Sequence, residues 1–124
     1  MTDKTVTMRY RMTDKDEYYD RLVNGARQYT LMEDVGRRLM AKVFHNVGRC
    51  VEIEACRQYI PAFTGNYLEY VARVVKEEDN FATIEVRCYK INDIPDPRPY
   101  PSSVDILEDP PLAAYGFYRF EYPI

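Results

Sequence analysis

A periodic apolar pattern from Asn24 to Phe44 constrains the fold of this chain more than any other feature. Apolar residues recur there at intervals of three and four, and polar or charged residues fill the remaining positions, as in an amphipathic helix. Asn24 can cap this helix, and its end is expected near His45 and Gly48. Because a helix of about six turns is long for a chain of 124 residues, we expect it to be the central packing element of a single domain covering residues 1–124.

Outside this helix the apolar residues alternate with a period of two, which predicts strands. Thr5 to Met12 is expected to be the first strand, and the charged segment from Thr13 to Arg21 is expected to be a loop or a single turn. Three strands should follow the helix, and their short connections predict that they are consecutive and antiparallel. Together with the first and the final strand, these three strands predict an α+β fold of about five antiparallel strands and one long helix. The last four strands are expected at about 49–59, 68–76, 81–91 and 113–122.

A proline-rich segment at about 92–112 separates the last two strands. Proline has no backbone N–H and cannot donate to a sheet ladder, so we expect this segment to be an ordered or semi-ordered excursion and not a strand.

Composition excludes several classes of protein. A net charge of -3 argues against a nucleic-acid partner. No apolar run approaches the roughly 18 residues that cross a bilayer, and the N-terminal segment is charged, so we expect a soluble, cytoplasmic protein with no membrane partner. The three cysteines lack CxxC spacing, which predicts buried reduced thiols and no metal site.

Several segments together resemble a known family. They are LVNGAR at 22–27, DVG at 34–36, Pro61 with Gly65, the strand at 86–91 and the segment 109–111. On these residues the chain resembles the small hot dog enzymes that act on β-aminoacyl-CoA, the β-alanyl-CoA and 3-aminobutyryl-CoA ammonia-lyases. It departs from them before the helix, where the family usually has a His before the tyrosine and then a small-residue stretch ending in Asn, and this chain has Glu17, Asp20 and Arg21. It also departs at Arg57, where the family tends to have an acidic residue.

The resemblance implies a hot dog fold, in which a curved antiparallel sheet wraps one long helix. It also implies a reversible lyase that adds or removes ammonia at the β carbon of a short acyl-CoA. Coenzyme A would be part of the substrate, and no metal or other cofactor is expected. The expected assembly is a homodimer with the site at the subunit interface, and the larger assembly that the resemblance implies is a trimer of dimers.

The helix start and the acids on the helix supply the candidate site residues. Backbone N–H groups at Asn24, Gly25 and Ala26 are expected to hold the developing enolate oxygen, because a helix start offers unpaired donors. Asp34 is the predicted general base, with Glu33 as the less favoured substitute. The alternative for Asp34 is a solvated acid that pairs with an arginine three or four residues later.

Two further residues complete the predicted site. Tyr18 aligns with a tyrosine of the family and is a candidate acid or orienting group, although most tyrosines only pack. Arg57 shares the alternation of Val51, Ile53 and Ala55, which predicts an inward or interface charge. It would contact a carboxylate of the acyl group or form an ion pair across the subunit interface.

The sequence leaves other functions open. A hot dog acyl-CoA thioesterase would use the same helix and the same acid to hydrolyse the thioester. Hydration of an enoyl-CoA is a third variant of the chemistry. A non-catalytic acyl-CoA binding or scaffold protein is the alternative that the departures at Glu17, Arg21 and Arg57 favour.

Overall fold

The computed structural model describes residues 3–124 and confirms the central helix. Helix α1 spans Gly25–Phe44, and the Asn24 side chain accepts a hydrogen bond of 3.0 Å from the Ala26 N–H. His45 ends the helix in the left-handed conformation, with φ of 57°. One face of the helix is buried, through Gln28, Leu31, Met32, Val35, Gly36, Leu39 and Met40.

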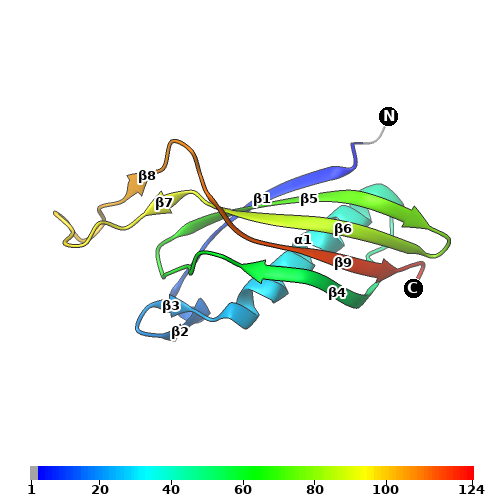
Figure 1. Cartoon of the computed structure of the whole chain (residues 1–124), viewed down its shortest axis with the longest axis horizontal. Helices are drawn as coiled ribbons and strands as arrows, with labels where there is room; N and C mark the ends of the chain where they lie inside the picture. Colours follow the sequence, from blue (N-terminus) through cyan, green and yellow to red (C-terminus); the bar gives the residue numbers. More distant parts are fainter. Residues whose placement is uncertain (1–2) are drawn as a thin grey trace.

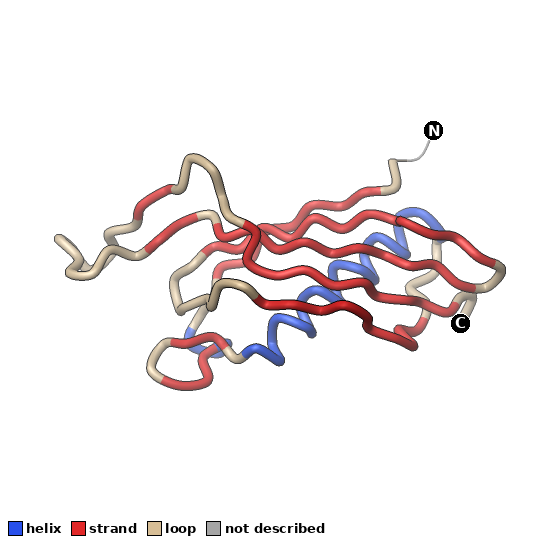
Figure 2. The backbone as a smooth tube through the Cα atoms, in the orientation of Figure 1, coloured by secondary structure: helices blue, strands red, loops and turns tan. Residues whose placement is uncertain are grey.

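Five antiparallel strands lie side by side across this buried face (Figures 1 and 2). The sheet order is β1-β5-β6-β9-β4, so β1 and β4 are its two edges. The predicted architecture of one long helix and a five-stranded antiparallel sheet is confirmed. The strands are β1 (Thr5–Arg11), β4 (Arg49–Gln58), β5 (Tyr67–Glu78), β6 (Phe81–Lys90) and β9 (Leu112–Glu121).

The predicted pairing of the three strands after the helix is only partly right. Strands β5 and β6 are antiparallel neighbours joined by a tight turn, as expected, but β4 pairs with β9 and not with β5. The segment 59–66 between β4 and β5 is long enough to cross the end of the sheet, and Phe63 within it forms a bridge to Leu22. The connection between β4 and β5 therefore does not make these two strands neighbours in the sheet.

The side-chain alternation predicted for β4 is wrong, because the strand contains two β-bulges. Each bulge adds one residue opposite a single partner and reverses which face the following residues occupy. Val51 and Ala55 lie within these bulges, and Ala55 has a φ of 51°. Judged by their partners on β9, the residues that face the helix side are Cys50, Ile53, Cys56 and Gln58, whereas Glu52, Glu54 and Arg57 face the outer side.

The two segments predicted to lack strands contain short ones. The charged segment before the helix forms a 3-10 turn η1 (Asp14–Asp16), a strand β2 (Glu17–Tyr19) and its partner β3 (Leu22–Val23). In the proline-rich segment, β7 (Asn92–Asp93) pairs with β8 (Asp105–Ile106). The four prolines from 95 to 101 lie in the loop between these strands and leave the ladder intact. Both hairpins lie at the end of the molecule where the helix begins (Figure 1).

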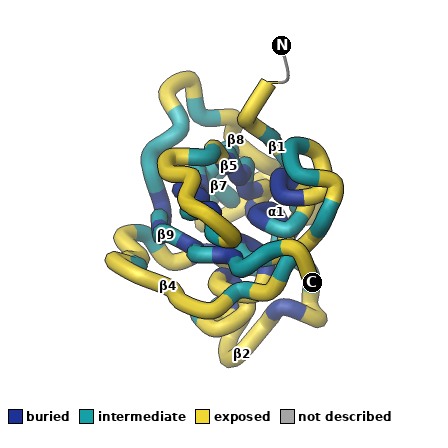
Figure 3. Tube along the Cα trace, turned by 90° about the vertical axis from the view of Figure 1, so that its right-hand side faces the viewer, coloured by how far each residue is buried: buried dark blue, intermediate teal, exposed yellow. Residues whose placement is uncertain are grey.

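The core lies between the helix and the sheet, where the buried residues of both layers meet (Figure 3). Cys88 is buried there as a free thiol, as predicted, but Cys50 and Cys56 are only half-buried, because they lie on the edge strand β4. No helix in the described part of the chain has the length and apolar character needed to cross a bilayer.

Candidate active site

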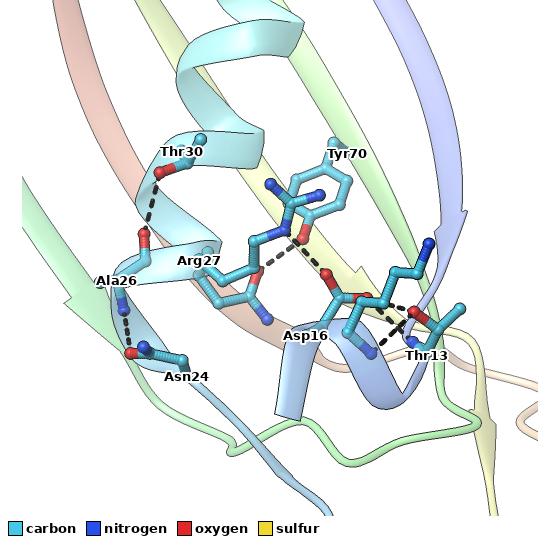
Figure 4. Close-up of polar contacts among 9 residues, drawn as sticks. Thr13, Asp16, Asn24, Ala26, Arg27, Thr30 and Tyr70 are labelled. Atoms are coloured by element: carbon cyan, nitrogen blue, oxygen red, sulfur yellow. Dashed lines mark hydrogen bonds and ion pairs between the residues drawn. The ribbon is translucent and has the colours of Figure 1, made fainter. Parts of the chain in front are cut away.

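The first turn of the helix is held from one side by Asp16 in the turn η1 (Figure 4). The Asp16 carboxylate accepts hydrogen bonds of 2.8 Å from the Thr13 N–H and of 2.8 Å from Arg27 Nε, and its backbone carbonyl accepts from the Asn24 N–H at 3.0 Å. Burial alone would raise the pKa of Asp16, but the hydrogen bonds from Thr13 and Arg27 outweigh it, so this pKa lies below its ordinary value. Asp16 therefore fixes the preceding turn against the helix start.

A second contact holds the same turn of the helix from the sheet. The buried Tyr70 hydroxyl on β5 donates a 2.5 Å hydrogen bond to Gln28 Oε1. Burial raises the pKa of Tyr70, and burial also raises the pKa of the neighbouring Cys88 thiol to about 12. Both groups therefore stay protonated near neutral pH, and the helix start is tied to the centre of the sheet by a neutral hydrogen bond.

The end of β4 closes over the helix start through Gln58. Gln58 Nε2 donates a 3.1 Å hydrogen bond to the Gly25 carbonyl oxygen. A Cβ atom on Gly25 would lie only 3.2 Å from this nitrogen, so glycine allows the close approach. Sequence reasoning missed Gln58, because the bulge that turns it toward the helix cannot be recognised in the alternation of β4.

The three residues predicted at the helix start lie together, but their N–H groups are not equivalent. The Ala26 N–H donates to the Asn24 side chain, and the Asn24 N–H donates to the Asp16 carbonyl. The Gly25 N–H forms no hydrogen bond with any of residues 3–124. Of the three predicted donors, Gly25 therefore has the N–H that is available to a ligand.

The two acids on the helix share one arginine. Asp34 accepts a 2.8 Å hydrogen bond from Arg37, whose guanidinium also binds Glu33. The Asp34 side chain is 51% exposed, whereas Glu33 is 26% exposed and lies beside Cys50. Burial and the charge of Glu33 raise the pKa of the Cys50 thiol to about 11. The ion pair that the sequence left open for Asp34 is thus present within one chain.

Tyr18 and Arg57 lie apart from this cluster of contacts. Tyr18 is 73% exposed on β2, and its side chain forms no hydrogen bond with another described residue. Arg57 is opposite Tyr115 on the outer side of the sheet, away from the helix, and it forms no ion pair within residues 3–124. The inward placement of Arg57 is therefore wrong, because of the bulge before it, whereas a charge at a subunit interface stays a prediction.

Within the described residues, no three His, Cys, Asp or Glu side chains are grouped so that they could hold a metal ion. The polar groups that converge at the helix start are hydrogen-bond donors and acceptors from β4, η1 and α1. Their arrangement suits the binding of an oxygen that develops negative charge, because an unpaired N–H at the positive end of a helix favours an anion.

Comparisons with known proteins agree with this fold. No known protein-family profile matches the chain, and no curated protein matches it by sequence. Among solved structures, β-alanyl-CoA:ammonia lyase from Clostridium propionicum is similar with a TM-score of 0.88 and 24% identity, covering 98% of this chain and 87% of that chain.

Two further similar structures are thioester hydrolases. An acyl-CoA hydrolase mutant from Staphylococcus aureus has a TM-score of 0.77 and 15% identity, over 98% of this chain and 67% of that chain. A hexameric thioesterase from Yersinia pestis has a TM-score of 0.75 and 13% identity, over 94% of this chain and 85% of that chain. These likenesses confirm the predicted hot dog fold.

Proposed function

We propose that this protein acts on coenzyme A thioesters as a lyase that reversibly adds or removes ammonia at the β carbon of a short acyl group. The observation that carries the proposal is the Gly25 N–H, which is unpaired within residues 3–124, at a helix start that is fixed from two sides. Such a donor suits the thioester oxygen, which becomes negative when the α proton is removed. The likeness to β-alanyl-CoA:ammonia lyase supports the choice of this reaction.

The proposed elimination has two steps. Asp34, or Glu33 in its place, removes the α proton, and the electron pair moves to the thioester oxygen, which the Gly25 N–H binds. The electron pair then returns to form the carbon–carbon double bond. The bond between the β carbon and the protonated amino group breaks, and neutral ammonia leaves. Tyr18 is the proposed orienting or proton-donating group at the acyl end. The base loses its proton to solvent.

The proposed site combines residues of two subunits. Asp34 lies eight residues after Ala26, which is about 12 Å along the helix axis. This separation is too long for both to act on one thioester from the same helix, so the acid of one subunit would face the helix start of another. Strand β4 is an open edge with Val51 and Ile53 exposed, which suits edge-to-edge pairing in a homodimer.

A trimer of dimers is the proposed larger assembly. The support for it is the likeness to a hexameric thioesterase. Analytical ultracentrifugation of the purified protein would test it, because a dimer and a hexamer of a 14.7 kDa chain sediment at clearly different rates.

A second candidate function is acyl-CoA hydrolysis. The likeness to an acyl-CoA hydrolase and to a thioesterase favours it, and the same acid would activate water for attack on the thioester. Arg37 holds both Glu33 and Asp34 in the single chain, so either reaction requires that one acid is released toward the substrate.

The test is to incubate the protein with acryloyl-CoA and with crotonyl-CoA, with and without ammonium, and to identify the products by mass spectrometry. An ammonia adduct supports the lyase, free coenzyme A would establish the thioesterase instead, and a water adduct would establish a hydratase. Asp34→Asn should abolish turnover. Unchanged turnover in that variant would remove Asp34 from the mechanism, and unchanged thioesters with the unmodified protein would favour a binding or scaffold role.

A further inference from the structure

A groove separate from the helix start lies between the two short hairpins. It encloses about 420 Å³, which is within the range of small-molecule sites, and it is built from four separate segments of the chain. These are the β2–β3 turn, the loop before β5, the end of β6 and the proline-rich segment. We call it the loop groove.

Two arginines of the loop groove have unpaired charge. Arg21 and Arg98 line the groove, and neither forms an ion pair within the described residues. Arg98 donates one hydrogen bond, to the Pro101 carbonyl at 3.0 Å, which leaves most of its five donors unused. The third cation, Lys90, is already held by Asp93 at 2.5 Å, and its side chain is only 15% exposed. Arg21 and Arg98 are therefore the groups with donors to offer to a phosphate.

The other walls of the groove suit a flat ring with polar substituents. Phe63 is 40% exposed and presents an aromatic ring, while Ile94 and Pro95 add apolar surface. Asp20 and Asp96 also line the groove, and neither forms an ion pair with another residue in the range 3–124, so their carboxylates can accept hydrogen bonds from hydroxyl or amino groups. A nucleotide has all three complementary parts: phosphates, a ring, and hydroxyl or amino donors.

The charge balance of the groove argues for a nucleotide over a bare anion. Three cations, Arg21, Lys90 and Arg98, face three carboxylates, so the groove has no net positive charge to attract phosphate by its field alone. Affinity must then come from directed hydrogen bonds and ring contacts. Binding through such contacts is less sensitive to salt than binding to a strongly basic surface.

The position of the groove connects it to the helix start. Arg21 precedes Gly25 by four residues, which is at most about 14 Å of extended chain. Leu22 also forms a bridge to Phe63, so the groove wall and the entry to the helix are one connected structure. A thioester at Gly25 with a long flexible arm can therefore have its far end in the loop groove.

We infer that the loop groove binds the nucleotide end of coenzyme A, with phosphates on Arg21 and Arg98, the base against Phe63, and sugar or amino groups on Asp20 and Asp96. This inference rests on the proposed function in taking the ligand to be a coenzyme A thioester. A free adenine nucleotide has the same chemistry and is the other possible source of the ligand, so the experiment separates the two.

Isothermal titration calorimetry on the intact protein tests the inference. The probes are coenzyme A, adenosine 3′,5′-bisphosphate, ATP and pantetheine, which lacks the nucleotide. We expect the bisphosphate to bind and to compete with coenzyme A, and we expect Arg21→Gln and Arg98→Gln each to weaken coenzyme A by about tenfold or more, because each removes a charge-assisted hydrogen bond. Phe63→Leu should weaken it as well, and pantetheine should bind equally to all variants.

Arg9→Gln is the matched control, because it makes the same change of charge at an exposed residue of β1, where Arg9 pairs with Glu69. Its coenzyme A affinity should equal that of the unmodified protein. Normal affinity in both groove variants, or no binding of the bisphosphate, would overturn the inference. ATP binding more tightly than coenzyme A, with the same loss in the variants, would overturn it in favour of a free-nucleotide site. Because binding is measured without turnover, an inactive protein that still binds through the groove would sink the lyase proposal alone.

Discussion

Removal of the Asp16 carboxylate is the sharpest test of how the helix start is held. In Asp16→Ala the Thr13 N–H loses its acceptor, which costs about 1 kcal/mol, as for other helix caps. The bond to Arg27 is charge-assisted, but the arginine is 44% exposed, so we take the low end of the usual range, about 1.5 kcal/mol. The expected loss in the free energy of unfolding is therefore about 2.5 kcal/mol.

Thermal unfolding followed by circular dichroism measures this loss. With an unfolding entropy of about 2.1 cal/mol/K per residue, a chain of 124 residues has about 0.26 kcal/mol/K, so the melting temperature should fall by about 10 °C. Asp16→Asn keeps an acceptor oxygen without the charge and should lose about half as much. A loss below about 1 kcal/mol in Asp16→Ala would refute the reasoning from these hydrogen bonds.

The pH dependence gives an independent check on the same carboxylate. The pKa of Asp16 in the folded protein lies below its ordinary value of 3.8, so its stabilising effect is fully present above that pH. The effect is lost as the pH falls through the lower, folded pKa. The difference between the unmodified protein and Asp16→Ala should therefore be constant from pH 5 to 7 and shrink below about pH 3.8. A difference that is the same at pH 3 and pH 6 would show that charge is not its cause.

Three further predictions concern the sheet. Tyr70→Phe leaves the buried Gln28 Oε1 without its donor and should cost about 1–3 kcal/mol of unfolding free energy in urea denaturation, whereas an unchanged midpoint would contradict the 2.5 Å bond. Gly116→Ala places a Cβ 2.3 Å from Cys56 Sγ and should cost about 1–3 kcal/mol, and adding Cys56→Ala should restore most of it. Cys50, with a pKa raised to about 11, should react with iodoacetamide at pH 8 more slowly than free cysteine, as site-resolved mass spectrometry would show, and an equal rate would contradict the effect of burial and Glu33.

Regular periodicity made most of the fold predictable. The helix was predicted to begin at Asn24 and to end near His45 to Gly48, and it spans Gly25–Phe44. All five strands of the sheet were anticipated, although two bulges interrupt the alternation within β4. The order of the strands was harder, since it depends on where a connection crosses the sheet. Nothing in the segment 59–66 indicates that it leads away from β4 and toward β1.

The site was less predictable than the fold for a local reason. Asn24 and Gly25 have a sequence signature, and the structure places both at the helix start as predicted. Arg57 and Gln58 are adjacent on β4, and the face that each occupies depends on one bulged residue, Ala55, in a conformation that is unusual for alanine. An alternation counted from Val51 therefore placed Arg57 on the face toward the helix. Gln58 occupies that face instead, and it was not predicted.

The helix start and Asp34, the two parts of the proposed catalytic site, are held by different kinds of contact. Each kind of contact suits the proposed role, which is oxyanion binding at the helix start and proton removal at Asp34. A donor for a developing oxyanion is most effective when it does not need to reorganise, and Asp16 with Tyr70 fixes the helix start through largely buried contacts. A general base must instead exchange its partner, and among the described residues Asp34 has one ion-pair partner to release, the surface residue Arg37. If the helix start binds the oxyanion, loosening it should lower kcat more than it raises KM, because the interaction is strongest in the transition state. Tyr70→Phe, whose side chain contacts no proposed reacting group, is the variant in which to measure that ratio.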